Sequence, residues 1–139
     1  MATPPLPDDL SALLEQPNPA VIATLGADGR PVSVATWYVM DGGDALVSMD
    51  ATRKRLEHLR RDPRVSLTVL DGDDWYRHVT LRGRVVELRD DEGLADIDRI
   101  STHYRGQAYS HRTSPRVTAR IAVERWHGWH AGRPLERDA

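Results

Sequence analysis

The alternation of apolar and polar positions predicts a mainly β chain. Residues 64–70 and 116–123 alternate throughout, which is typical of antiparallel strands with one buried face. Apolar runs bounded by turn residues predict four more strands, at residues 20–25, 31–40, 45–49 and 75–88. The turn residues Asp28-Gly29 and Asp41-Gly42-Gly43-Asp44 should join the first three of these four strands into an antiparallel meander.

Apolar residues at helical spacing predict three helices inserted between the strands. They cover residues 7–16, 52–61 and 91–104. Residues 106–115 should form a polar loop, and residues 124–139 show no clear period. Because the expected strands are short and joined by tight turns, we predict a six-stranded antiparallel barrel with inserted helices, forming one domain over residues 1–139.

Composition narrows the classes of function. The chain has 139 residues, a formal net charge of −2 and no cysteine. The charge gives no sign of nucleic-acid or membrane binding, and the lack of cysteine excludes disulfides and thiolate catalysis. No apolar run approaches the roughly 20 residues that span a bilayer, and residues 1–5 lack signal-peptide features, so we expect a cytoplasmic protein. His127 and His130 have no third ligand at a recognisable spacing, so we expect no metal.

The strongest chemical signal lies at the start of the second expected helix. Ser48 ends a strand, Thr52 lies at the helix start, and Arg53-Lys54-Arg55 fall in its first turn. Free N–H groups and the helix dipole attract anions to such a terminus, whereas cations there are normally unfavourable. The pattern therefore favours a phosphate that neutralises the basic residues. The alternative is a solvated basic helix capped by Asp50 or Thr52.

The strand around residues 75–83 is a second candidate. If Val79 and Leu81 face the core, His78 and Thr80 face the other side, where they could line a cleft for a planar ring; the alternative is an ordinary solvated face. Gly83 predicts a bulge or a close backbone approach. The chain has neither a glycine-rich phosphate loop nor a nucleophile elbow, so a nucleotide-like cofactor would be held by side chains and a helix end.

Three motifs occur in an order that one family shares. The run from Ser48 to Lys54 is similar to a hydroxyl-x-x-x-Ser-Arg-Lys phosphate motif, with Thr52 at the serine position. Residues 77–83 are similar to an Arg-Gln-Val-Arg-Ile-x-Gly strand, and His78 stands where the Gln reaches the flavin of a partner subunit. Residues 124–129 are similar to a tail in which a tryptophan closes over the cofactor. The chain thus resembles the pyridoxamine 5′-phosphate oxidase superfamily of flavin- and deazaflavin-binding split β-barrels.

The resemblance implies a six-stranded split barrel and a homodimer with two cofactor sites at the subunit interface. It implies a small-molecule substrate and assigns no catalytic residue. The residues it implies are Ser48, Thr52, Arg53 and Lys54 at the phosphate, the backbone of Ser33 and Val34 behind the ring, His78 and Trp129 at the cofactor, and Trp37 and Tyr109 at the substrate.

The chain is more similar to the short actinobacterial branch of this superfamily in its length and in residues 50–54 and 60–65. Many members of that branch use coenzyme F420, an anionic deazaflavin. Residues 133–137 lack the histidine of the vitamin B6 substrate motif. The resemblance therefore implies hydride transfer between F420 and a small conjugated or unsaturated substrate. Two alternatives stay open. One is an FMN-dependent oxidase or reductase, and the other is a non-catalytic protein that binds a flavin or another planar ligand.

Overall fold

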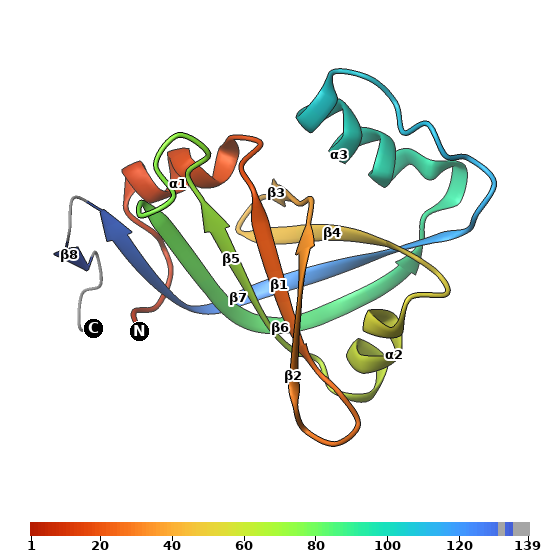
Figure 1. Cartoon of the computed structure of the whole chain (residues 1–139), viewed down its shortest axis with the longest axis horizontal. Coiled ribbons are helices and arrows are strands. Elements are labelled where there is room, and N and C mark those ends of the chain that lie inside the picture. The colour runs from red at the N-terminus through yellow and green to blue at the C-terminus, as the bar shows by residue number, and fades with distance from the viewer. Residues whose placement is uncertain (131–132, 135–139) are drawn as a thin grey trace.

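A computed structural model describes residues 1–130 and 133–134, with side chains up to residue 129. One antiparallel sheet curls around the core, and helices lie at its ends (Figure 1). The strands are β1 (Ala20–Leu25), β2 (Pro31–Thr36), β3 (Val39–Asp41), β4 (Asp44–Asp50), β5 (Arg64–Leu70), β6 (His78–Asp90), β7 (Arg116–His130) and β8 (Arg133–Pro134). The helices are α1 (Asp8–Glu15), α2 (Lys54–Arg61), the 3-10 turn η1 (Glu92–Leu94) and α3 (Ala95–Arg105).

The predicted mainly β split-barrel fold is confirmed, but the strand count is not. Within the described residues, seven strands follow the path β2-β1-β5-β6-β7-β4-β3, and the short β8 pairs with β7. The expected meander is also wrong, because β1 pairs with β2 and β3 pairs with β4 at opposite ends of this path. Since β2 and β3 are consecutive in the chain, the link between them joins the two edges of the sheet.

Tyr38 is the reason that the predicted strand 31–40 breaks into two. Its side chain is fully buried, and its hydroxyl donates to the carbonyl oxygen of Leu14 at 2.7 Å. Its ring also packs edge to face against Tyr104, with centroids 6.4 Å apart. The chain therefore turns inward after Thr36 and begins a new strand at Val39. Residues 31–40 favour a strand throughout, so the buried position of Tyr38 could not be predicted from them.

The core lies inside the curled sheet and under α1 and α2. Burying each large aliphatic side chain there contributes roughly 1.5–3 kcal/mol. A second cluster joins Ile97 and Ile100 of α3 to Val39 and Leu46, which fixes α3 over β3 and β4. The main cluster includes Leu10, Leu13, Ile22, Val47, Met49, Leu56, Leu59, Leu67, Val79, Leu81 and Ile121.

Strand β7 continues to His130, beyond the predicted end at residue 123. Glu124 is an extra residue opposite the step from Arg82 to Gly83, so the pairing shifts there. Before this bulge Val117, Ala119 and Ile121 are buried, whereas after it the even-numbered Trp126 is buried. The alternation of the strand therefore does not continue in step through residues 124–130. The predicted close approach at Gly83 is confirmed, because a Cβ there would overlap the carbonyl oxygen of Ala122.

Strand β2 keeps one apolar face uncovered. Val32 and Val34 are 43% and 42% exposed, although their register partners on β1, Thr24 and Ile22, are buried. Cross-strand partners point to the same side of a sheet, so this face continues the core side of β1 without a cover. No helix of the described chain is long and apolar enough to cross a membrane.

Candidate functional site

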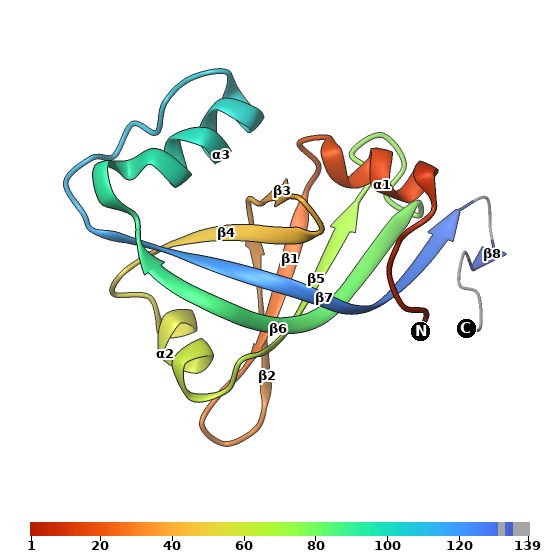
Figure 2. The same ribbon diagram turned by 180° about the vertical axis from the view of Figure 1, so that it is seen from behind.

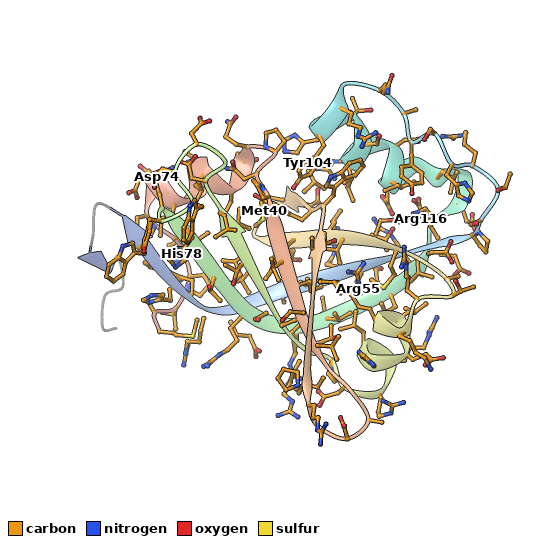
Figure 3. The ribbon with its side chains drawn as sticks, viewed as in Figure 1. Met40, Arg55, Asp74, His78, Tyr104 and Arg116 are labelled. Atoms are coloured by element: carbon orange, nitrogen blue, oxygen red, sulfur yellow. The ribbon has the colours of Figure 1, made fainter. Side chains whose placement is uncertain are left out.

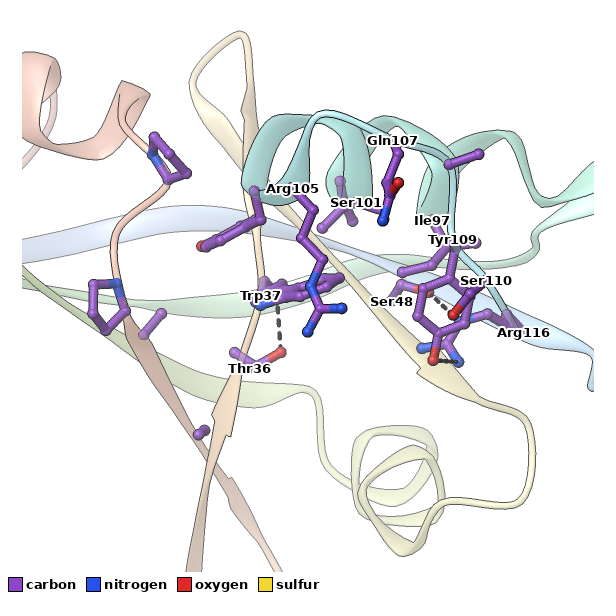
Figure 4. A pocket seen from close by; sticks show the side chains of 17 residues that line it. Thr36, Trp37, Ser48, Ile97, Ser101, Arg105, Gln107, Tyr109, Ser110 and Arg116 are labelled. Atoms are coloured by element: carbon purple, nitrogen blue, oxygen red, sulfur yellow. Dashed lines mark hydrogen bonds between the residues drawn. The ribbon is translucent and has the colours of Figure 1, made fainter. Parts of the chain in front are cut away.

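A cavity of about 760 Å³ lies between α3, the end of β2 and the facing ends of β4 and β7 (Figure 4). Figures 1 and 2 both show α2 and α3 on either side of the end of β4. Two arginines and no carboxylates are among the described residues that line the cavity. The polar and aromatic members of this lining are Thr36, Trp37, Ser48, Ser101, Tyr104, Arg105, Gln107, Tyr109, Ser110 and Arg116.

Ser48, Tyr109 and Arg116 form one end of the cavity. The antiparallel pairing of β4 with β7 places Asp50 opposite Arg116, and the Arg116 Nε donates to the Ser48 Oγ at 2.9 Å. The guanidinium carbon of Arg116 lies 4.8 Å from the centre of the Tyr109 ring. The N–H of Tyr109 donates to the Asp98 carboxylate at 3.0 Å. This end therefore presents a positive group whose position is fixed by a hydroxyl and a ring.

The basic run begins just beyond this end of the cavity. Helix α2 starts at Lys54, with Arg53 as its N-cap, rather than at the predicted Thr52. The Asp50 carboxylate accepts bonds from the Thr52 hydroxyl at 2.7 Å and the Thr52 N–H at 2.9 Å. The Thr52 hydroxyl bond is the main reason that the pKa of Asp50 lies below its usual value. No side chain caps the helix, so Asp50 shapes the turn and leaves the helix end open.

Arg55 is a cation in an unfavourable place. Its Nε is buried and has no hydrogen-bond partner among the described residues. Burial lowers its pKa, and repulsion from Arg53 and Arg116 lowers it further. Two guanidinium groups thus lie close enough to repel Arg55. In the described part of the chain none of the three arginines forms an ion pair with a carboxylate, although Arg116 attracts the Asp50 carboxylate opposite it and helps to lower its pKa. Lys54 pairs with Glu57 at 3.4 Å, and both side chains are highly exposed. An arriving anion would relieve this repulsion.

The structure brings only some of the predicted site residues together. Trp37, Ser48 and Tyr109 line the same cavity. Ser33 and Val34 lie on exposed β2, directly before the residues at its end that also line the cavity. Thr52, Arg53 and Lys54 lie outside the lining, at the start of α2 next to the Ser48 end.

His78 and Trp129 are not near this group. They are partners across β6 and β7, and His78 lies at the opposite end of the barrel from Arg55 and Arg116 (Figure 3). The Nδ1 of His78 is 2.9 Å from the Tyr76 carbonyl oxygen. A single chain therefore does not join the two groups of predicted cofactor residues. Of the C-terminal run 133–137, residues 135–137 lie outside the described residues.

Sequence reasoning did not assign Arg105 or Arg116 to the site. Arg55 belonged to the basic run, so its position was visible, but its burial was not. Arg116 opens a regular strand, and Arg105 ends α3, where its guanidinium carbon lies 5.2 Å from the centre of the Trp37 ring. Basic residues at strand and helix ends are common, so only their tertiary placement around the cavity distinguishes these two.

Comparisons with known proteins identify the family and the fold. The family model described as pyridoxamine 5′-phosphate oxidase matches residues 6–130. A solved structure described as an F420 reductase is 25% identical, with a TM-score of 0.81 over 87% of this chain and 98% of its own. A conserved hypothetical protein from Mycobacterium tuberculosis is also 25% identical, with a TM-score of 0.73 over 91% of this chain and 86% of its own. A heme-binding protein from Mycobacterium smegmatis shares the fold at 21% identity and a TM-score of 0.70, over 94% of this chain and 57% of its own.

Proposed function

The chain belongs to the pyridoxamine 5′-phosphate oxidase family, and from this membership we propose that it transfers a hydride between coenzyme F420 and a small conjugated or unsaturated substrate. Its family and its likeness to an F420 reductase make it a flavin- or deazaflavin-related oxidoreductase or binding protein. The choice of F420 and of hydride transfer is the proposal, and it depends on how the chain would hold an anion.

The observation that carries the proposal is the unpaired cationic cluster. Arg53 and Arg116 both repel Arg55 beside the cavity, and the Arg55 Nε has no partner among the described residues. Arginine binds phosphate and carboxylate through its planar array of N–H donors. F420 carries a phosphodiester and several carboxylates, so it offers more anionic groups than FMN for this cluster and for Arg60 and Arg61 further along α2. The donor set therefore fits such a tail.

The remaining residues have roles in binding and shielding. The cofactor supplies the hydride chemistry when it is bound, and the protein positions it. Arg53 and Lys54 would bind its phosphate beside the open start of α2, and the backbone of Ser33 and Val34 would lie behind its ring. Trp37 and Tyr109 line the adjoining cavity, where they would exclude water from a substrate. No residue is assigned as the proton donor.

A homodimer is part of this proposal. His78 and Trp129 lie at the far end of the barrel from Arg55, so a second copy would have to bring them to the cofactor. The uncovered face of β2 and the stacked pair Trp75 and Tyr76, which are 65% and 63% exposed, offer apolar surface for such a contact. We expect light scattering to give a dimer. A monomer of 15.6 kDa at micromolar concentration, with cofactor bound, would contradict this part of the proposal.

Two variants test the phosphate site. A charge-assisted hydrogen bond contributes roughly 1.5–3 kcal/mol, so Arg53→Ala and Lys54→Ala should each weaken F420 binding about tenfold to a hundredfold. Arg99→Ala is the matched control, because Arg99 is exposed on α3 and is not among the described residues that line the cavity. Unchanged affinity in both α2 variants would refute the assignment of the site.

Stopped-flow mixing of reduced F420 with a conjugated enone or a quinone then tests the reaction. We expect reoxidation of F420 that needs the protein and little reaction with oxygen. Cofactor that binds but does not react with any such acceptor would favour the non-catalytic binder. Tight FMN binding with hydrogen peroxide formed in air would favour the oxidase.

A further inference from the structure

Arg105 is a second cationic group of the cavity, separate from the cluster at α2. Figure 4 shows it over Trp37, whereas Arg116 lies beside Ser48 and Tyr109 at another part of the cavity. We propose that Arg105 binds a carboxylate of the substrate, so that the cavity selects planar conjugated acids over their neutral analogues. This inference rests on the proposed function only in taking the cavity as the substrate site.

The first support is that Arg105 has no ionic partner. It makes no hydrogen bond or ion pair with any of the described residues. Its basic neighbours differ in this respect, since Arg99 pairs with Asp41 at 3.1 Å and Arg112 pairs with Asp98 at 2.8 Å. Carboxylates are thus plentiful around α3 but are paired elsewhere. Arg105 is left to face a lining that contains no acidic residue among those described.

The second support is the platform that holds Arg105. Its guanidinium lies over the Trp37 ring at 5.2 Å, and Trp37 is stacked on Tyr104 with centroids 5.2 Å apart. Burial raises the pKa of Tyr104 to about 12, so its hydroxyl stays protonated and donates to the Asn18 carbonyl oxygen at 2.8 Å. Stacking occupies a face of the guanidinium and leaves its N–H edge available for a carboxylate.

The third support is the character of the space beside Arg105. Ile97, Ile100 and Ala108 line the cavity together with the aromatic rings of Trp37 and Tyr109. A flat apolar body fits such walls, and a charged end would reach Arg105. The alternative is that Arg105 only complements the C-terminal dipole of α3, a role that would not distinguish an acid from its amide.

Calorimetric titration of 2-naphthoate and 2-naphthamide, without cofactor, tests the difference. We expect the wild type to bind the acid about tenfold more tightly than the amide, as one charge-assisted hydrogen bond at a partly exposed group allows. Arg105→Gln should abolish this preference without changing the affinity for the amide, and Arg105→Lys should keep part of it. Arg99→Gln, which removes one exposed charge of the same helix outside the cavity lining, should keep all of it.

Several results would overturn the inference. Equal affinity for acid and amide, no binding of the acid, or an unchanged preference in Arg105→Gln would each do so. The outcome is separable from that of the proposed function. If the acid preference depends on Arg105 but reduced F420 transfers no hydride to any conjugated acceptor, the proposed function fails and the role of Arg105 stands. If enones are reduced but acids and esters react equally well, only the role of Arg105 fails.

Discussion

Replacing Arg55 by methionine should separate stability from cofactor binding. The Nε of Arg55 is buried and has no hydrogen-bond partner among the described residues. The Arg55 guanidinium is also repelled by two other guanidinium groups. An unsatisfied buried polar group costs about 1–3 kcal/mol. Because Arg55 is only half-buried, we take the lower end of this range. Methionine keeps the aliphatic stem in place, so Arg55→Met should stabilise the cofactor-free protein by about 1 kcal/mol.

Thermal unfolding of the cofactor-free protein measures this effect. A gain of about 1 kcal/mol raises the Tm of a domain of this size by about 3 °C. Arg60→Met is the matched control, since Arg60 is exposed in the last turn of the same helix and its loss should leave the Tm unchanged or lower it slightly. The same Arg55 variant should bind F420 at least tenfold more weakly. A lower Tm, or an unchanged affinity for F420, would refute the idea that this cluster is strained to bind an anion.

Three further outcomes concern the fold. Gly83→Ala should destabilise the protein by more than about 2 kcal/mol in urea unfolding, because the new Cβ would overlap the Ala122 carbonyl. Gly43→Ala is the control, since Gly43 has open space around it. Equal stability of the two variants would refute the close approach. Tyr38→Phe should cost about 1 kcal/mol through loss of the bond to Leu14, and unchanged unfolding would show that this bond adds nothing. Burial alone would raise the pKa of Asp96, but bonds from Arg89 and Thr118 lower it below its usual value. Asp96 therefore stabilises the fold above about pH 4 and loses this effect on acidification. The difference in unfolding free energy between wild type and Asp96→Asn should therefore shrink toward pH 2. A difference that does not change with pH would contradict the pairing.

The local elements could be predicted from the sequence because their signals are local. The alternation at residues 64–70 and the turn at Asp28-Gly29 depend on short-range geometry. The strand and the turn were both found where they were expected. The connection across Trp37 and Tyr38 could not be predicted, because it depends on the buried contact of Tyr38 with Leu14. The continuation of β7 beyond residue 123 could not be predicted, because the extra residue Glu124 forms a bulge. After this bulge the opposite set of alternating residues faces the core.

The candidate site divides in the same way. The run from Thr52 to Arg55 could be predicted as an anion site, since the helix end and the basic residues are adjacent in the chain. Arg105 and Arg116 could not be assigned, because they reach the cavity from the end of α3 and the start of β7, and only the packing of these elements around the cavity brings the two residues to it. The roles of His78 and Trp129 depend on a second subunit and remain predictions.

A parallel titration of the protein with F420 and with FMN, at low and at moderate salt, tests the central claim most directly. The cationic cluster of Arg53, Arg55 and Arg116 predicts that F420 binds more tightly than FMN. It also predicts that the affinity for F420 falls more steeply as salt screens the charges of its longer anionic tail. Tight FMN binding with no F420 binding at either salt concentration would contradict the account.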